Sequence, residues 1–162
     1  MRKNQKGRSA KKDKQPLPHE RALRKLYQGP LGGLARCVEV HRDDRYPMAR
    51  GDWAYVSSQG AIYLNPRREA SAGEWEYVLA HCMLHLGLGH LREDRLGDSL
   101  WGMACDLAVT RFLQDCRIGT PPVEFTGELP LSAKGEEQFW EQLRAMPELA
   151  GTDRFSTMTC SR

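Results

Sequence analysis

The pattern of apolar and polar positions predicts that the folded part of the chain begins with helix. Residues 19–35 carry apolar side chains at helical spacing, but Gly29 and Pro30 fall inside this segment. Proline lacks a backbone donor and glycine weakens a helix, so we expect two short helices with a break between them. Residues 37–40 then form a short β-prone run, and residues 42–51 are polar and predict a loop.

A hairpin and a buried helix are expected next. Residues 53–65 contain two β-prone runs on either side of residues 57–60, whose sequence Ser-Ser-Gln-Gly is a turn signal. Ser71 is followed three residues later by Glu74, which is the capping-box spacing and predicts the start of a helix over residues 72–88. Apolar side chains surround most of this helix, so we expect it to be central and buried.

The remaining pattern predicts two more helices. Gly89 is suited to end the buried helix in a left-handed cap. Residues 100–113 form a second, largely apolar helix, and residues 132–146 form an amphipathic one. This succession predicts an α+β fold, in which a small mixed sheet or hairpin packs on a buried helix. We expect residues 19–147 to form one domain and residues 148–162 to be a flexible C-terminal segment.

Composition excludes a membrane-spanning protein and argues against secretion. The chain has 162 residues and 40% of them are hydrophobic, which is enough for one domain with a core of its own. No apolar run approaches the ~20 residues that span a bilayer, and the N-terminus lacks the apolar stretch of a secretory signal. The five cysteines include no CxxC pair, so a disulfide framework is not indicated. We therefore expect a cytoplasmic protein.

The positive charge is concentrated in residues 1–18. These residues hold seven lysines and arginines against one acid, whereas the whole chain has a net charge of +3. A segment this charged and this poor in apolar side chains predicts a disordered basic tail. Such a tail either contacts nucleic acid or an acidic partner, or only aids solubility. Because no aromatic residues interleave the charges, the sequence favours the second role.

Three of the five histidines lie within residues 81–90. His81 and His85 are four residues apart, so they share one face of the predicted helix. A helix fixes the separation of two imidazoles at little further cost in entropy. Zinc prefers imidazole nitrogen and takes three protein ligands in catalytic sites. The pair therefore predicts a site for one Zn²⁺ per chain.

Two residues are candidates for the third ligand. Asp106 lies in the middle of the next apolar helix, where an ionisable group is costly unless it is paired or bound to a metal. It either ligates the ion or orients a histidine by a hydrogen bond. His90 would point away from His85 on a continuous helix, and it reaches the ion only if the chain turns at Gly87 or Gly89. Otherwise His90 orients a metal ligand by a hydrogen bond without touching the ion, or it is simply a histidine at the end of the helix.

Several segments around these histidines form a combined motif. They are Ala61-Ile62-Tyr63-Leu64-Asn65-Pro66, Val78-Leu79-Ala80-His81, Leu84-His85 with His90, and Trp101 with Ala104-Cys105-Asp106-Leu107-Ala108-Val109. The motif resembles the metallopeptidase domain that precedes von Willebrand factor A-like domains in bacterial proteins. The similarity covers about residues 20–145 and is more specific than the HxxxH pattern alone.

The resemblance implies a zincin-like fold, with an HExxH-type helix and an edge strand beside the cleft. It implies His81 and His85 as metal ligands, with Asp106 as the third. The implied edge strand pairs with an extended peptide by β-augmentation and consists of Ala61, Ile62, Tyr63, Leu64 and Asn65. The implied partners are a peptide or protein substrate and a von Willebrand factor A-type domain or an associated ATPase.

The sequence departs from HExxH at Cys82, which stands where the motif has its general-base glutamate. A thiol cannot hold and deprotonate water as a carboxylate does, and losing such a group typically costs roughly 10²–10⁴-fold in rate. Cys82 is an inert buried thiol, a redox-active or metal-bound one, or a position whose role Glu74 or Glu76 takes over. We expect a zinc-binding, metallopeptidase-like domain with impaired hydrolysis, or a catalytically inactive module that binds a peptide or protein.

A second HxxxH family also lacks the glutamate, namely the metal-dependent endonucleases that mature ribosomal RNA. They carry a small residue after the first histidine and a third histidine downstream, much as His90 follows His85 here. The basic tail would suit an RNA substrate. However, their third histidine typically lies one residue further on, and the family leaves the Asp106 segment unexplained. An endoribonuclease is therefore the second alternative.

Overall fold

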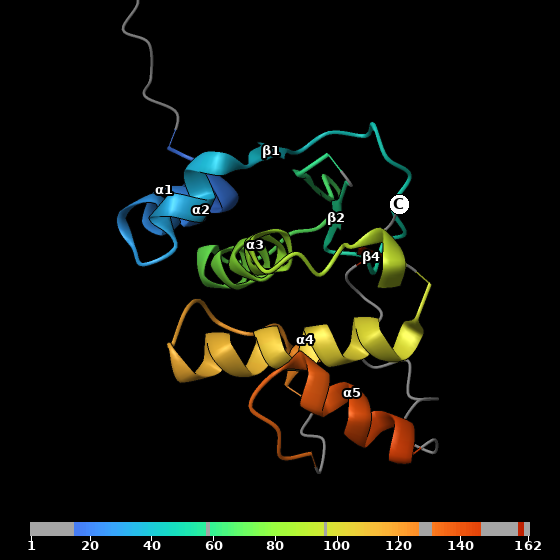
Figure 1. Cartoon of the computed structure of the whole chain (residues 1–162). Coiled ribbons are helices and arrows are strands. Elements are labelled where there is room, and N and C mark those ends of the chain that lie inside the picture. Colours follow the sequence, from blue (N-terminus) through green and yellow to red (C-terminus); the bar gives the residue numbers. More distant parts are fainter. Residues whose placement is uncertain (1–14, 58, 96, 127–130, 147–158, 161–162) are drawn as a thin grey trace, which may run out of the picture.

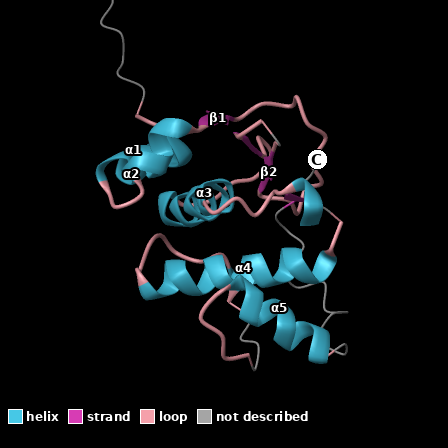
Figure 2. Cartoon of the chain, in the orientation of Figure 1, coloured by secondary structure: helices cyan, strands magenta, loops and turns pink. Residues whose placement is uncertain are grey.

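The structure, a computed structural model, describes residues 15–57, 59–95, 97–126, 131–146 and 159–160. Within them it is a mixed α+β fold of five α-helices and a small mixed sheet (Figures 1 and 2), which confirms the fold class at that level. The elements are, in order, α1 (Pro18–Gln28), α2 (Gly32–Cys37), β1 (Glu39–His41), β2 (Ala54–Val56), β3 (Ala61–Leu64), α3 (Ala72–Gly87), η1 (Glu93–Arg95), α4 (Ser99–Asp115), η2 (Val123–Phe125), α5 (Glu136–Ala145) and β4 (Thr159–Cys160).

Helix α3 lies in the middle of the fold. Figure 1 shows α1, α2 and the sheet on one side of it and α4 on the other, with α5 beyond α4. Residues 75–85 of α3 are all buried, as the apolar sequence around this helix predicts. The main core joins α3 to the sheet, α1 and α2, and a second apolar cluster lies between α4 and α5. Helix α3 therefore packs on both sides, and Val109 and Leu113 of α4 also belong to the main core.

Both ends of α3 follow the local sequence. At the start, Ser71 Oγ accepts the Glu74 N–H at 3.2 Å and Glu74 Oε2 accepts the Ser71 N–H at 2.9 Å, which confirms the capping box. At the end, Gly89 has a φ of 69° and its N–H donates to the Leu86 carbonyl. The His90 N–H donates to the His85 carbonyl at 3.0 Å. These two bonds form a Schellman cap, in which glycine takes the left-handed position.

The sheet has the strand order β1-β3-β2-β4. Strands β2 and β3 are antiparallel neighbours joined through Gly60, whose φ is 86°, which confirms the predicted hairpin. Strand β1 pairs with the other side of β3 in parallel, and β4 pairs with β2 in parallel. Strand β3 is therefore an inner strand with partners on both sides. The expectation that residues 61–65 form an edge strand is wrong, because β1 occupies that edge.

Some element bounds differ from the sequence prediction. Helix α5 begins at Glu136 rather than at residue 132, since Gly135 precedes it in an extended conformation with a φ of −161°. The predicted basic tail lies outside the described residues up to residue 14, and α1 already begins at Pro18. The expected flexible C-terminal segment lies outside them too, except for the two residues of β4. Among the described helices, none is long and apolar enough to cross a bilayer.

Candidate metal centre

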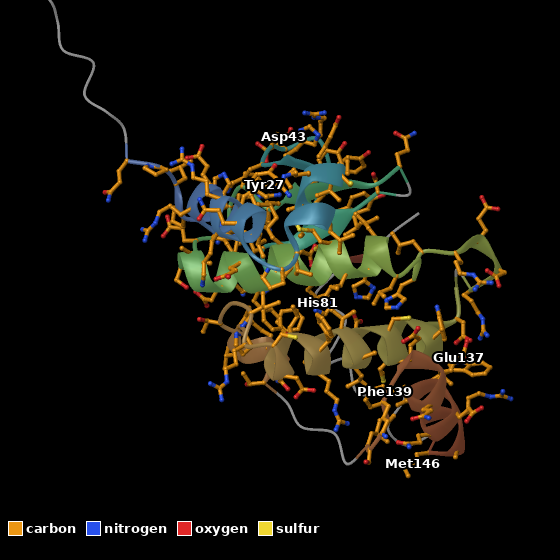
Figure 3. All side chains as sticks on the ribbon, turned by 60° about the vertical axis from the view of Figure 1, so that its left-hand side comes forward. Tyr27, Asp43, His81, Glu137, Phe139 and Met146 are labelled. Atoms are coloured by element: carbon orange, nitrogen blue, oxygen red, sulfur yellow. The ribbon has the colours of Figure 1, made fainter. Side chains whose placement is uncertain are left out.

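Three polar side chains meet where α3 faces α4. His81 and His85 come from α3 and Asp106 comes from α4. His81 Nε2 lies 3.0 Å from Asp106 Oδ1, His85 Nε2 lies 3.1 Å from the same oxygen, and the two Nε2 atoms are 2.9 Å apart. Figure 3 labels His81 on the side of α3 that is turned toward α4. The structure thus brings together the three residues that the sequence singled out as a ligand set.

Helical spacing explains why these side chains converge. His81 and His85 are one turn apart, so α3 directs both rings to the same neighbour. On α4, Asp106 precedes Val109 and Leu113 by three and seven residues, and these two apolar side chains belong to the main core. Residues at such intervals share one helix face. The face of α4 that packs toward the main core therefore carries Asp106 to the two histidines.

The three donor atoms suit a small divalent metal ion. Zinc bonds to imidazole nitrogen and carboxylate oxygen at about 2.0–2.2 Å, so a tetrahedral site separates its donors by about 3.3–3.5 Å. The separations observed between the donor atoms of His81, His85 and Asp106 are 2.9–3.1 Å. A shift of a few tenths of an ångström outward gives the metal-binding spacing. Three protein ligands also leave one position for an exogenous ligand, as in catalytic zinc sites.

The charges of the cluster favour a cation as well. Burial lowers the pKa of His81, and this effect outweighs the hydrogen bond to Asp106 that raises it. Burial raises the pKa of Asp106, but the hydrogen bonds from His81 and His85 outweigh it, so the pKa of this carboxyl lies below its usual value. A neutral His81 imidazole and an ionised carboxylate are the forms that coordinate a metal.

His90 lies next to this cluster but not in it. The chain does turn at Gly89, and the turn brings His90 Nδ1 to 3.3 Å from His85 Nδ1. That nitrogen of His85 is not the one that faces Asp106, which is Nε2. Of the two candidates for a third ligand, the structure therefore places Asp106 at the shared focus and His90 behind His85. The endoribonuclease alternative needs His90 as a ligand, and this placement gives it no support.

His90 also makes the metal-free protein sensitive to acid. Burial first, and then the neighbouring His85, lower the pKa of His90 from 6.5 to about 4. In the unfolded chain a histidine titrates near 6.5. Below that pH the unfolded state binds a proton at His90 that the folded state does not bind until about pH 4. The free energy of unfolding therefore falls as the pH falls. Between pH 7 and pH 5 this residue should account for a loss of about 2 kcal/mol.

Urea denaturation of the metal-free protein at pH 7 and pH 5 measures this loss. The same pair of measurements on His90→Gln removes the contribution of His90 and leaves those of the other histidines. We expect the wild-type protein to lose more stability than the variant over this interval. Equal losses in the two proteins would show that His90 is protonated at the same pH in the folded and unfolded states.

Cys82 is not one of the converging donors. It is 1% exposed and belongs to the main core with side chains such as Leu79 and Met83. The two acids that could have replaced the missing glutamate are engaged elsewhere. Glu74 closes the capping box with Ser71, and Glu76 accepts from Lys25 Nζ of α1 at 2.7 Å. Neither glutamate is therefore free to act as a general base at the donor atoms.

The residues predicted as a substrate strand are used inside the fold. Ile62 and Leu64 are fully buried in the main core, and Tyr63 stacks on His41 on the other face of the sheet. The Asn65 side chain is fully buried and donates to the carbonyls of Ala49 and Asp52, so it stabilises the loop that precedes β2. The outer strands of the described sheet are β1 and β4 instead.

One neighbour of this site, Glu136, has no signal in the sequence. Glu136 at the start of α5 places Oε1 4.0 Å from His90 Nε2. It lies 46 residues after His90 in an ordinary charged turn, and no local spacing connects the two. Only the packing of α5 on α4 brings Glu136 to the site.

Comparison of the chain with protein-family models, with curated proteins and with solved structures finds no match. The observation that bears on function is therefore the geometry in which His81, His85 and Asp106 converge.

Proposed function

We propose that this domain binds one divalent metal ion between α3 and α4, and that the ion is zinc. The observation that carries the proposal is the convergence of His81 Nε2, His85 Nε2 and Asp106 Oδ1 within 2.9–3.1 Å of one another. Two imidazoles and one carboxylate form a donor set typical of zinc. Burial supports the proposal too, because the His81 and His85 side chains are 0% and 4% exposed and the pair is held by rigid helix.

We further propose that the domain is metallopeptidase-like but impaired in hydrolysis. When bound, zinc supplies Lewis-acid activation of a carbonyl or a water. The chain has to supply the proton transfer, and the position of the usual general base holds Cys82, which lies in the main core. Glu74 and Glu76 are held by Ser71 and Lys25. The domain thus combines a metal-binding donor set with a cysteine in place of the general-base glutamate, which suits a module that binds a peptide or protein.

Metal binding tests the proposal directly. Isothermal titration of the full chain with zinc is expected to show one ion per chain, and a chelator is expected to reverse the binding. Zinc at a hundred times its dissociation constant should raise the free energy of unfolding by about 2.7 kcal/mol, because only the folded state holds the site together.

The variant His85→Ala locates the site, and His41→Ala is its matched control. His41 lies on β1 with a quarter of its side chain exposed, and it is not among the converging donors. We expect His85→Ala to lose zinc binding and His41→Ala to keep it. The proposed site would be refuted if the wild-type protein takes up no zinc, or if the two variants bind zinc equally well.

A further inference from the structure

The Nδ1 atom of His85, which faces away from Asp106, has a hydrogen-bonding partner. The Nδ1 atom of His81 has none among the described residues. His85 turns Nε2 toward Asp106, and its other nitrogen, Nδ1, lies 3.3 Å from His90 Nδ1. His81 Nδ1 is buried without a hydrogen bond in the part of the chain that the structure describes. Metal-bound histidines are usually oriented by a group that accepts the proton of the second nitrogen. In this cluster, His85 is therefore the ligand that the surrounding chain can orient.

The Schellman cap fixes the contact between the two rings. In this motif the second residue past the helix end lies over the residue that begins its last turn, and an apolar pair commonly makes that contact. Here the pair is His90 and His85, with the His90 N–H bonded to the His85 carbonyl and Gly89 in the left-handed position. The ring contact is thus a consequence of how α3 ends and does not depend on a flexible loop.

Metal binding at His85 determines which ring nitrogen carries the hydrogen in His85 and in His90. A neutral imidazole carries one N–H, and a metal bound at His85 Nε2 leaves that hydrogen on Nδ1. His90 Nδ1 must then accept, since two N–H groups facing each other at 3.3 Å would repel. The single hydrogen of His90 is thereby assigned to Nε2.

His90 Nε2 is in turn a donor that needs an acceptor. The His90 side chain is 2% exposed, and its Nε2 has no hydrogen bond among the described residues. Buried donors without a partner are rare. Glu136 Oε1 lies 4.0 Å away, and its side chain is 35% exposed, so a change of rotamer can bring the carboxylate within hydrogen-bonding distance. Glu136 also begins α5, the helix that packs against α4, which carries Asp106.

We infer that His90 and Glu136 are positioning residues for the metal ligand His85, in a relay that runs from His85 Nδ1–H to His90 Nδ1 and from His90 Nε2–H to the Glu136 carboxylate. This inference rests on the proposed metal site. The relay holds the His85 ring in the orientation that the cation needs, and it ties α5 to the metal centre. Removing a partner of this kind typically weakens metal affinity by about 10–100-fold.

Two substitutions of His90 separate hydrogen bonding from packing. His90→Asn keeps an acceptor close to the place of Nδ1 but leaves more empty volume, whereas His90→Leu fills the volume and removes the acceptor. Zinc dissociation constants of the full chain are measured by competition with a chromophoric chelator. We expect His90→Leu to weaken zinc binding by about 10–100-fold and His90→Asn to stay within a few-fold of the wild-type protein. Urea denaturation of the metal-free variants checks that both are folded.

Histidine tautomers give a second measurement that a packing role would leave unchanged. Long-range ¹H–¹⁵N spectra of the zinc-loaded protein should show His90 with its hydrogen on Nε2, the His90 signals being those absent from His90→Asn. Glu136→Gln should shift the resonance of that hydrogen and weaken zinc binding a few-fold. Glu137→Gln, one residue further along α5 and mostly exposed, should do neither.

The outcomes distinguish this inference from the proposed function. If the wild-type protein binds no zinc, the metal site and the relay both fail. If it binds zinc but His90→Leu binds equally well, or binds better than His90→Asn, the relay fails and the metal site stands. A His90 hydrogen found on Nδ1 in the zinc-loaded protein overturns the relay in the same way.

Discussion

Asp106→Asn is expected to lower the affinity for zinc more than a hundredfold while the metal-free domain remains folded. The asparagine keeps the shape of the side chain, but it replaces an ionised oxygen with a neutral amide. Asp106 Oδ1 is the atom that both His81 Nε2 and His85 Nε2 approach within 3.1 Å, so the change removes one of three donors. Competition with a chromophoric chelator measures the dissociation constant, and circular dichroism checks the fold.

The size of this loss decides what Asp106 does. A carboxylate that only orients a ligand typically contributes about 10–100-fold to metal affinity, so a greater loss marks a direct ligand. Asp115→Asn is the matched control, because Asp115 is an exposed acid at the end of the same helix. We expect it to bind zinc as the wild-type protein does. A loss of only about 10–100-fold in Asp106→Asn would mean that Asp106 orients His81 and that the third donor lies elsewhere.

Local sequence predicts helix α3 almost completely. Ser71 and Glu74 fix its start and Gly89 fixes its end, and all three act on backbone groups within one turn. The spacing of His81 and His85 is a property of the helix alone. Asp106 could be singled out because an ionisable side chain on an apolar helix needs a partner. These parts of the site were predictable because each depends on residues close together in the sequence, or on a cost that any fold would impose.

The parts that the sequence could not predict depend on long-range packing. Strand β1 lies at the edge of the sheet because it pairs in parallel with β3, a strand some 20 residues away, and no local pattern specifies that pairing. The same limit applies to Glu136, which only the packing of α5 on α4 brings to His90. The packing of Cys82 in the main core was also open, since nearly the whole circumference of α3 is apolar and its sequence does not reveal which face meets the sheet.

Cys82→Glu would restore the HExxH motif in sequence, but we expect it to destabilise the domain by about 3–5 kcal/mol and to produce no peptidase. The Cys82 side chain is 1% exposed within the apolar main core. An uncompensated charge in such surroundings typically costs about 3–5 kcal/mol, and the longer side chain adds strain to a close-packed core. Urea denaturation measures the loss of stability.

Cys82→Ala is the control for this substitution. It should lower the free energy of unfolding by about 1 kcal/mol and bind zinc normally, because Sγ is not one of the converging donors. A Cys82→Glu protein with wild-type stability that cleaves peptides in the presence of zinc would show that residue 82 reaches the metal centre, and that the missing glutamate alone separates this domain from an active peptidase.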